Sequence, residues 1–184
     1  MLTCVLYYDS CALFEITITS LFMKQAGEVV TVGPEIRDYE SWEGLRVRPH
    51  MTLRDLDPES VDLFVVPGGN PDMVADDPDL QRTLRALNQK GKVIAAICGG
   101  PAVLVRSGIL KGRRYNSSLA EERKGEFDGA IHDDQNVVED GNIVTALPNA
   151  YVDLALTLGK KMNIFENQAD YDETVRIYRE FKRN

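Results

Sequence analysis

Short apolar runs alternate with amphipathic segments along most of this chain, and this alternation limits its fold more than any other feature of the sequence. The runs rich in β-branched and small apolar residues lie at 2–8, 28–32, 62–66 and 92–97. Between them, apolar side chains recur at helical spacing, as at Leu80, Leu84 and Leu87. Because each parallel strand needs a crossover to return the chain, this order predicts an α/β protein whose mostly parallel sheet is covered by helices.

The chain shows no change in composition that would divide it into parts. It has 184 residues, of which 43% are hydrophobic, enough to cover one sizeable core. There is no internal repeat, low-complexity tract or linker, so we predict a single domain over residues 1–184. The tail predicts an amphipathic helix at about 168–182 with an apolar stripe of Tyr171, Val175 and Tyr178. We expect this stripe to pack on its own chain, with docking on a partner as the alternative.

Charge and cysteine usage exclude several classes of protein. Asp and Glu total 29 against 21 Lys and Arg, a net charge of −8, and no stretch gathers basic side chains. Nucleic acids and anionic membranes are therefore not expected partners. The start has no basic leader, and no apolar run approaches the roughly 20 residues that span a bilayer, so we expect a cytoplasmic protein. Three cysteines without Cys-x-x-Cys spacing predict free thiols, and we expect neither a metal site nor a cofactor.

The stretch VIAAICGGPAVL, residues 93–104, places a thiol at a corner between a strand and a helix. Gly99 and Gly100 leave room for a tight turn after Cys98, and Pro101 suits the first turn of the helix that follows. A nucleophile between small residues at such a corner is the layout of a nucleophile elbow. The alternative is a small buried cysteine that only ends a strand.

The position of Cys98 at the start of a predicted helix also indicates the direction in which its pKa should shift. Unpaired N–H groups and the dipole at a helix N-terminus favour the thiolate, so we expect the pKa of Cys98 to lie below the usual value of about 8.5. Cys4 lies inside the first strand and is interpreted as a packing residue. Cys11 is interpreted as a surface or packing thiol, with an exposed, oxidisable thiol as the alternative.

Three loops follow strands that end at one edge of the predicted sheet, where open parallel sheets bind ligands. They are the segment from Asp9 to Glu15, the turn Pro67-Gly68-Gly69-Asn70, and Cys98-Gly99. The backbone N–H groups of Gly69 and Gly99 are candidates to bind an oxyanion beside the sulfur. As an alternative, both are ordinary turn glycines. Asp9 and Asn70 are candidates to line the pocket.

Glu15 is the one acid on a helix that leaves this edge with strong apolar neighbours. A carboxylate facing a thiolate would repel it, so the pair would hold one proton between them, and the pKa of the carboxyl would rise. Glu15 is therefore a candidate proton partner for Cys98. The alternative is a solvated residue on the helix surface.

With these residues assembled, the sequence resembles the ThiJ/PfpI superfamily, the group that includes DJ-one and has the class I glutamine amidotransferase-like fold. The resemblance is carried by the Glu15 helix and by three segments: DLFVVPGGN, KVIAAICGGPAVLVRSGILKGRR and NVVEDGNIVTALPNAYVDLAL. It implies a three-layer α/β/α sandwich with a flavodoxin-like, doubly wound sheet. It also implies Cys98 as nucleophile, Glu15 as its protonated partner, the amides of Gly69 and Gly99 as oxyanion donors, and a homodimer.

The sequence departs from the superfamily pattern at several positions. Members related to the intracellular protease have His directly after the cysteine, whereas this chain has Gly99, which disfavours peptidase activity. Many glyoxalase-like or deglycase-like members carry a further His near the stretch written here RRYNSSLAEE, where Ser118 takes its place. Isonitrile hydratase relatives favour Asp at the position of Glu15 and Thr after the cysteine. Neither is present.

Two classes of function follow from these residues. In the first, the protein is an enzyme of the glyoxalase, deglycase or hydratase type, a hydrolase or lyase in which Cys98 adds to a small electrophile and Glu15 moves the proton. In the second, it is a redox-responsive stress protein, with chaperone-like action, whose Cys98 is oxidised to a sulfinate. A domain that only binds a metabolite, with an incidental thiol, is a third alternative.

Overall fold

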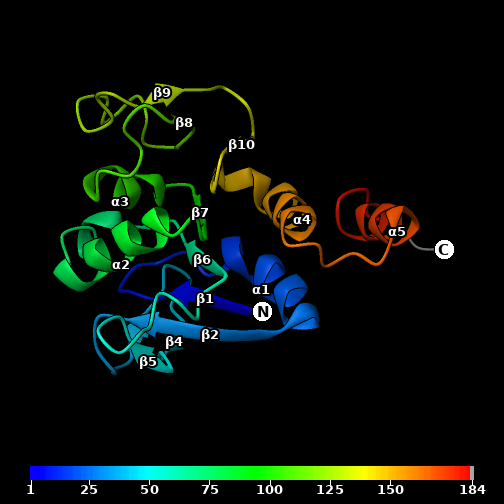
Figure 1. The fold of residues 1–184 in the computed structure, drawn as a ribbon, viewed down its shortest axis with the longest axis horizontal. Coiled ribbons are helices and arrows are strands. Elements are labelled where there is room, and N and C mark those ends of the chain that lie inside the picture. The colour runs from blue at the N-terminus through cyan, green and yellow to red at the C-terminus, as the bar shows by residue number, and fades with distance from the viewer. Residues whose placement is uncertain (183–184) are drawn as a thin grey trace.

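The computed structural model describes residues 1–182, and among them one sheet dominates (Figure 1). Its seven strands, within that range, have the order β10-β11-β7-β6-β1-β2-β5. The strands are β1 (Leu2–Leu6), β2 (Glu28–Gly33), β5 (Met51–Thr52), β6 (Leu63–Val66), β7 (Val93–Ile97), β10 (Val137–Asp140) and β11 (Ile143–Ala146). Neighbouring strands are parallel except for the hairpin of β10 and β11. The predicted α/β class with a mostly parallel sheet is confirmed.

Helices cover both faces of this sheet and give three layers (Figure 1). On one side lie α1 (Phe14–Ala26) and α4 (Tyr151–Lys161), and on the other lie α2 (Pro78–Gln89) and α3 (Pro101–Arg106). Short elements complete the described chain: the pairs β3 (Tyr39–Glu40) with β4 (Arg46–Val47) and β8 (Arg114–Tyr115) with β9 (Ile131–His132), and the single turns η1 (Pro71–Met73) and η2 (Pro148–Ala150).

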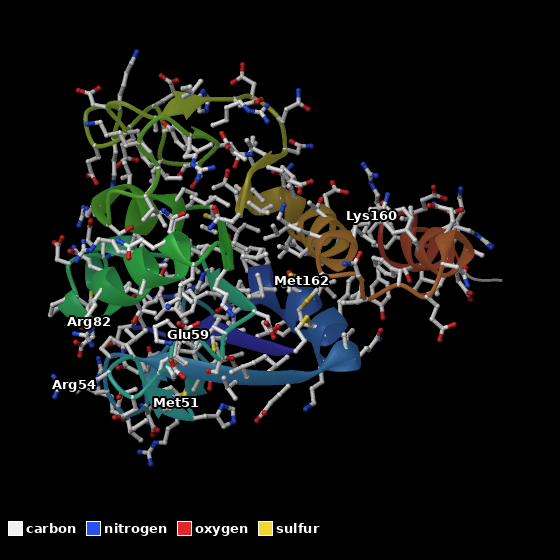
Figure 2. All side chains as sticks on the ribbon, in the orientation of Figure 1. Met51, Arg54, Glu59, Arg82, Lys160 and Met162 are labelled. Atoms are coloured by element: carbon white, nitrogen blue, oxygen red, sulfur yellow. The ribbon has the colours of Figure 1, made fainter. Side chains whose placement is uncertain are left out.

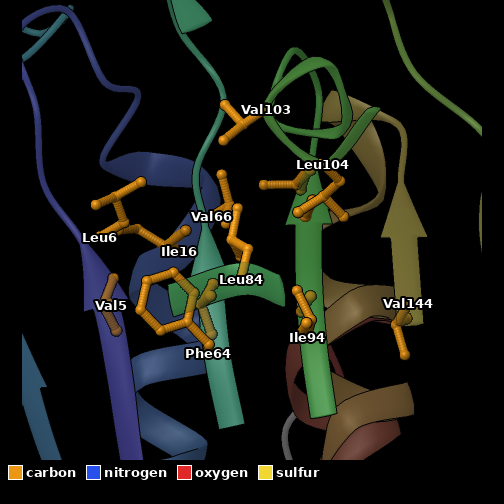
Figure 3. Packing of buried hydrophobic residues seen from close by; sticks show 14 of the residues in the cluster. Val5, Leu6, Ile16, Phe64, Val66, Leu84, Ile94, Val103, Leu104 and Val144 are labelled. Atoms are coloured by element: carbon orange, nitrogen blue, oxygen red, sulfur yellow. The ribbon is translucent and has the colours of Figure 1, made fainter. Parts of the chain in front are cut away.

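The centre of the sheet is fully buried and forms a firm base for the loops at its edge. Every residue of β6 is buried, and so are the last four of β7, because helices cover both faces of these strands. In Figure 3, Phe64 and Ile94 lie on neighbouring strands, where they are register partners. Burying one such side chain contributes about 1.5–3 kcal/mol. The loops that follow β1, β6 and β7 therefore start from fixed positions.

The C-terminal helix α5 (Gln168–Tyr178) packs on its own chain through the predicted stripe. The ring of Tyr178 lies 5.0 Å from that of Phe22, and the ring of Tyr171 lies 5.2 Å from that of Phe165, both edge-on. Lys160, labelled in Figure 2, places its Nζ 3.7 Å from the centre of the Tyr171 ring. The helix ends at Tyr178, before the predicted boundary.

Two predictions concern the whole chain: the absence of a membrane-spanning segment and a single domain. Within residues 1–182, no helix combines the length and the apolar character needed to cross a bilayer. The single domain over residues 1–184 stays a prediction, and its last two residues lie outside the described range.

Candidate active site

Cys98 lies between the last residue of β7 and α3, on backbone that few side chains adopt. Its φ is +60°, in the left-handed region, which costs a non-glycine residue about 1 kcal/mol or more. Three hydrogen bonds hold it there. The Cys98 N–H donates to the Ala146 carbonyl at 2.8 Å, and the Cys98 carbonyl accepts from the Ser118 N–H at 3.1 Å and the Ser117 hydroxyl at 2.8 Å. The surroundings therefore impose this conformation at the end of the sheet.

The carboxyl of Glu15 is buried beside this thiol. Glu15 is the second residue of α1 and is 1% exposed, so the interpretation as a solvated helix residue is wrong. Its Oε2 accepts a hydrogen bond of 2.9 Å from the Gly68 N–H. A Cβ added at Gly68 would overlap that Oε2 and would approach Cys98 Cβ to 2.5 Å and Sγ to 2.9 Å. The Glu15 carboxyl and the Cys98 thiol therefore both lie against Gly68, where only a residue without a side chain fits.

The thiol holds its proton more tightly than expected. Burial raises the pKa of Cys98 above its ordinary value and the Glu15 carboxyl raises it further, while the Ser118 hydroxyl and the Gly69 N–H lower it. The prediction of a lowered pKa is wrong. Its helix, α3, has only six residues and therefore a small dipole, and loss of water around the sulfur outweighs it.

The predicted rise in the pKa of Glu15 is confirmed, with burial as the main cause. Hydrogen bonds from Cys98 and from the Gly68 N–H lower that pKa in part, and the nearby Glu43 raises it. Since burial disfavours the charged form of both groups, the pair is stable with its protons retained. Cys98 and Glu15 are therefore coupled, and neither titrates independently of the other.

Ser118 occupies the side of the site that faces solvent. Its Oγ lies 3.4 Å from Cys98 Sγ, so the hydroxyl is in hydrogen-bonding range of the sulfur. Ser118 is exposed whereas Cys98 is 8% exposed, which means that the thiol lies directly behind a solvent-accessible serine. A serine hydroxyl is neutral at pH 7 and is not a ready base.

The two glycines predicted to bind an oxyanion lie together at the sulfur. Gly69 has a φ of +102°, and its N–H interacts with Cys98 and lowers the pKa of the thiol. A Cβ at Gly99 would lie 3.1 Å from the Gly69 carbonyl oxygen, which shows how closely the two turns approach. Among the hydrogen bonds of residues 1–182, none uses the Gly99 N–H as donor. That group is available to an acceptor beside the thiol.

Two predicted pocket residues have other partners. Asp9 forms an ion pair of 2.5 Å with Arg37 and accepts from the Glu40 N–H. It lines a polar cavity of about 290 Å³ that Tyr8 and Asp72 also line and Cys98 does not. The Asn70 side chain accepts from the Asp72 N–H at 3.2 Å and so caps η1. Neither side chain is recorded in contact with the sulfur.

Tyr8 is a site residue that the sequence reasoning missed. It is 1% exposed, and its hydroxyl donates to the Gly68 carbonyl at 2.7 Å and lies 3.1 Å from that of Pro67, so it positions the glycine turn. Burial raises the pKa of Tyr8, which keeps the hydroxyl as a donor. Its signal in the sequence is an aromatic residue at the last position of the apolar run predicted as the first strand, 2–8. Cys11 is also fully buried, so the alternative of an exposed thiol there is wrong.

Cys4 and the remaining acids do not extend this site. No group of three or more His, Cys, Asp or Glu side chains able to hold a metal ion occurs in the described part of the chain. Cys4 is fully buried inside β1 with no recorded polar partner for its sulfur, as expected of a packing residue.

Comparison with known proteins places this site in a family. The model of the DJ-1/PfpI family matches residues 2–161, which include Glu15, the glycine turn and Cys98. The chain belongs to the DJ-1/PfpI family. The matched range ends before α5, so the C-terminal helix lies outside the family match.

Relatives within the family carry different names. A deglycase of Thermococcus kodakarensis is 33% identical over 104 residues, which are 56% of this chain and 63% of that protein. A glutathione-independent glyoxalase of Caenorhabditis elegans is 26% identical over 146 residues, 78% of each chain. The matches to the archaeal relatives span 56–63% of their length.

A solved structure supports the fold over nearly all of the chain. A DJ-1 superfamily protein of Salmonella typhimurium, crystallised as a cysteine-to-alanine variant, has a TM-score of 0.83 and 26% identity. The alignment covers 95% of this chain and 96% of that one. The DJ-1/PfpI fold therefore includes the three layers described above.

Proposed function

We propose that this DJ-1/PfpI protein is a cysteine-dependent enzyme of the glyoxalase or deglycase type that acts on a small carbonyl compound. One observation carries the proposal: a buried carboxyl, a thiol and an exposed hydroxyl meet at the end of the sheet, at Glu15, Cys98 and Ser118. A nucleophile held beside a proton donor is the arrangement that addition to a carbonyl requires. The names of the related deglycase and glyoxalase support the same substrate class.

The chemistry follows from where the protons lie. The Cys98 sulfur attacks the carbonyl carbon of an α-oxoaldehyde, an S–C bond forms, and the π electrons move to the carbonyl oxygen. That oxygen takes a proton from Glu15, and Glu15 takes the proton that leaves the thiol, so the carboxyl ends unchanged. Net conversion of an α-oxoaldehyde to a 2-hydroxy acid consumes one water and needs no redox cofactor.

The glycine amides support this addition by binding the oxygen as it gains charge. The Gly69 N–H already interacts with the sulfur, and the Gly99 N–H is not used by another acceptor within residues 1–182. Removal of one such donor from an oxyanion site commonly costs about 10²–10³ in kcat. The raised pKa of Cys98 means that the thiol loses its proton during attack, since little thiolate exists beforehand.

Turnover of methylglyoxal tests the proposal. Cys98→Ser should abolish turnover to the level of buffer, whereas Cys4→Ser, which alters a thiol outside the site, should retain the wild-type rate once folding is verified. Equal rates for wild type and Cys98→Ser would refute the proposal that Cys98 is the nucleophile of an enzyme.

A second candidate is a redox function, which the replacement of a base by Ser118 favours. Peroxide would convert the Cys98 thiol to a sulfenic acid with release of one water, and a second peroxide would give the sulfinate with another. Peptide mass spectrometry after mild peroxide should then show two oxygens on Cys98 before any on Cys4 or Cys11. Similar oxidation at all three would reject this candidate.

A peptidase is not proposed, although a 32% identical relative from Bacillus subtilis carries the name uncharacterized protease. Gly99 follows the nucleophile where a peptidase member would have a base, and Ser118 does not supply one.

The homodimer remains part of the proposal, and an apolar surface beside the site supports it. Phe14, Trp42 and Leu45 are 48%, 64% and 56% exposed. The Phe14 N–H donates to the Glu43 carboxylate, and the Trp42 N–H donates to the Cys11 carbonyl, so α1 and the β3–β4 turn meet here. Light scattering should give twice the chain mass for wild type and a monomer for Trp42→Glu. A wild-type monomer at micromolar concentration would overturn this assembly.

A further inference from the structure

Two arginines share two acidic residues beside the site, and together they form a cluster that the proposed chemistry does not use. Asp72 binds Arg123 through both carboxylate oxygens, at 2.7 and 2.8 Å, and also binds Arg106 at 2.6 Å. Glu126 lies 3.0 Å from Arg106 and 3.6 Å from Arg123. The arginine side chains are 23% and 18% exposed, whereas Asp72 and Glu126 are 46% and 34% exposed, so the cluster is distinguished by its bidentate, shared geometry rather than by burial.

The cluster joins three parts of the chain that surround Cys98. Asp72 lies in η1, the short helix that follows the glycine turn. Arg106 is the last residue of α3, the helix that follows Cys98. Arg123 and Glu126 belong to residues 118–129, a segment built of turns without helix or strand, which we call the cap segment. In Figure 1 it leads from β8 to β9.

The cap segment begins with the residue that lies on the sulfur. Ser118 has its Oγ 3.4 Å from Cys98 Sγ, and the Arg123 N–H donates to the Leu119 carbonyl at 2.9 Å. Arg123 is therefore one turn away from Leu119, the residue that follows Ser118, and is connected to Ser118 through the backbone. A shift of Arg123 would be transmitted to the start of the segment.

We propose that Asp72 is a positioning residue, which holds the cap segment through Arg123 and Arg106 so that the Ser118 hydroxyl stays beside the Cys98 sulfur. Bidentate binding of a guanidinium fixes both distance and orientation, which a single ion pair does not. Asp72 also separates two positive charges that would otherwise repel. Asn70, which caps η1, fixes the turn that presents this carboxylate. This inference rests on the proposed role of Cys98.

The test reads the ionisation of Cys98, because Ser118 favours the thiolate by hydrogen bonding. The other groups that face the sulfur are the Glu15 carboxyl on α1, the Gly69 N–H after β6 and the Tyr8 hydroxyl after β1. These groups stay in place in the variants below, so a change in the pH profile reports on the cap segment.

The experiment measures the rate of iodoacetamide alkylation of Cys98 against pH by peptide mass spectrometry. Ser118→Ala should move the profile to higher pH, by about 0.5–1 on the pH scale, and Asp72→Asn should move it in the same direction by a similar amount. In the double variant Asp72→Asn with Ser118→Ala, the shift of the pH profile should equal that of Ser118→Ala alone, because the two substitutions remove the same interaction, that of the Ser118 hydroxyl with the sulfur. Arg123→Gln should reproduce Asp72→Asn, and Arg123→Lys should restore part of the effect.

Asp76→Asn is the matched control, since Asp76 also binds Arg106, at 3.3 Å, but is 78% exposed and makes no recorded contact with the cap segment. Its profile should equal that of wild type. An unchanged profile in folded Asp72→Asn and Arg123→Gln, or fully additive changes in the double variant, would overturn the proposal. Absence of methylglyoxal turnover would count against the enzyme and not against this positioning, because alkylation does not depend on turnover.

Discussion

Cys4 and Cys98 are two buried thiols whose pKa burial raises, yet their surroundings differ in kind. Cys4 lies inside β1, is 0% exposed and has its pKa raised to about 12, with Asp62 and Glu28 adding to the effect. Cys98 ends β7, is 8% exposed, and has Ser118 and Gly69 as partners that lower its pKa in part. Burial alone therefore does not separate a packing cysteine from a candidate nucleophile. Polar partners and a path to solvent do.

The difference comes from position along a strand. A residue inside a parallel strand has neighbours on both sides in the ladder, and both faces of this sheet are covered, so Cys4 is kept away from the loops at the sheet edge. A residue after the end of a strand meets the loops that follow neighbouring strands. At Cys98 these loops supply Glu15, Gly68 and Gly69 from β1 and β6.

The largest effect expected from this comparison is selective alkylation. In native protein, iodoacetamide should modify Cys98 on the order of 100-fold or more faster than Cys4, because Cys4 reacts only after local opening and ionises only at high pH. Peptide mass spectrometry at pH 8 measures the ratio. In denaturant the cysteines should react at similar rates, and similar rates in native protein would contradict the comparison.

The glycine between acid and thiol provides the second prediction. Gly68→Ala should reduce turnover at least tenfold and destabilise the fold by about 1–3 kcal/mol, because its Cβ overlaps Glu15 and Cys98. Gly125→Ala is the matched control, since a Cβ there has no atom within 4 Å, and it should change stability by less than about 0.5 kcal/mol. Urea unfolding and methylglyoxal assays distinguish them. A tolerated Gly68→Ala would mean that the two groups are not packed together.

The third prediction separates reactivity from turnover. Glu15 raises the pKa of Cys98, so Glu15→Gln should lower that pKa and increase alkylation near neutral pH, by up to about tenfold if the pKa falls by about 1. Turnover should nevertheless fall by about 10² or more, because the proton donor is lost. Glu28→Gln, which removes an acid near Cys4 instead, should leave both properties of Cys98 unchanged. A higher pKa of Cys98 in Glu15→Gln would contradict the assigned cause.

The smallest effect concerns Cys4 and alkaline stability. Its folded pKa of about 12 lies well above the ordinary value for a cysteine, so the folded state favours the protonated thiol. That contribution is complete below pH 9 and is lost as the pH rises from 9 toward 12, by at most about 1.4 kcal/mol per pH unit. Urea unfolding at pH 8 and at pH 10.5 should show a larger loss for wild type than for Cys4→Ala. Equal losses in the two proteins would mean that the ionisation of Cys4 does not contribute to the loss of stability at high pH.

Much of the fold and part of the site follow from local sequence patterns. Apolar runs and helical spacing are properties of neighbouring residues, so the layers and the corner at Cys98 could be predicted. Glu15 and Gly69 could be placed at the site because strand ends converge in a parallel sheet. The family resemblance added Ser118 at the position of a missing histidine.

The rest depends on contacts between distant residues. The pKa of Cys98 was predicted from its own helix, whereas desolvation by packed neighbours sets its direction. Asp9 was expected in the pocket because of the strand it follows, yet Arg37, far along the chain, binds it. Tyr8 was missed because the carbonyl it binds, that of Gly68, lies on another loop. Local patterns predict which edge a loop reaches, and they do not predict which partner its side chain selects.

The central claim is that Glu15, buried against a thiol, keeps its proton beyond the pH at which a carboxyl ordinarily ionises. A carbon-13 NMR titration of glutamate side-chain carboxyls tests this most directly, with the Glu15 signal assigned by its loss in Glu15→Gln. The account predicts a midpoint above the ordinary value of 4.5 for that signal. A midpoint at or below 4.5 would show a carboxylate that ionises as if exposed, and would contradict the proposed proton partner of Cys98.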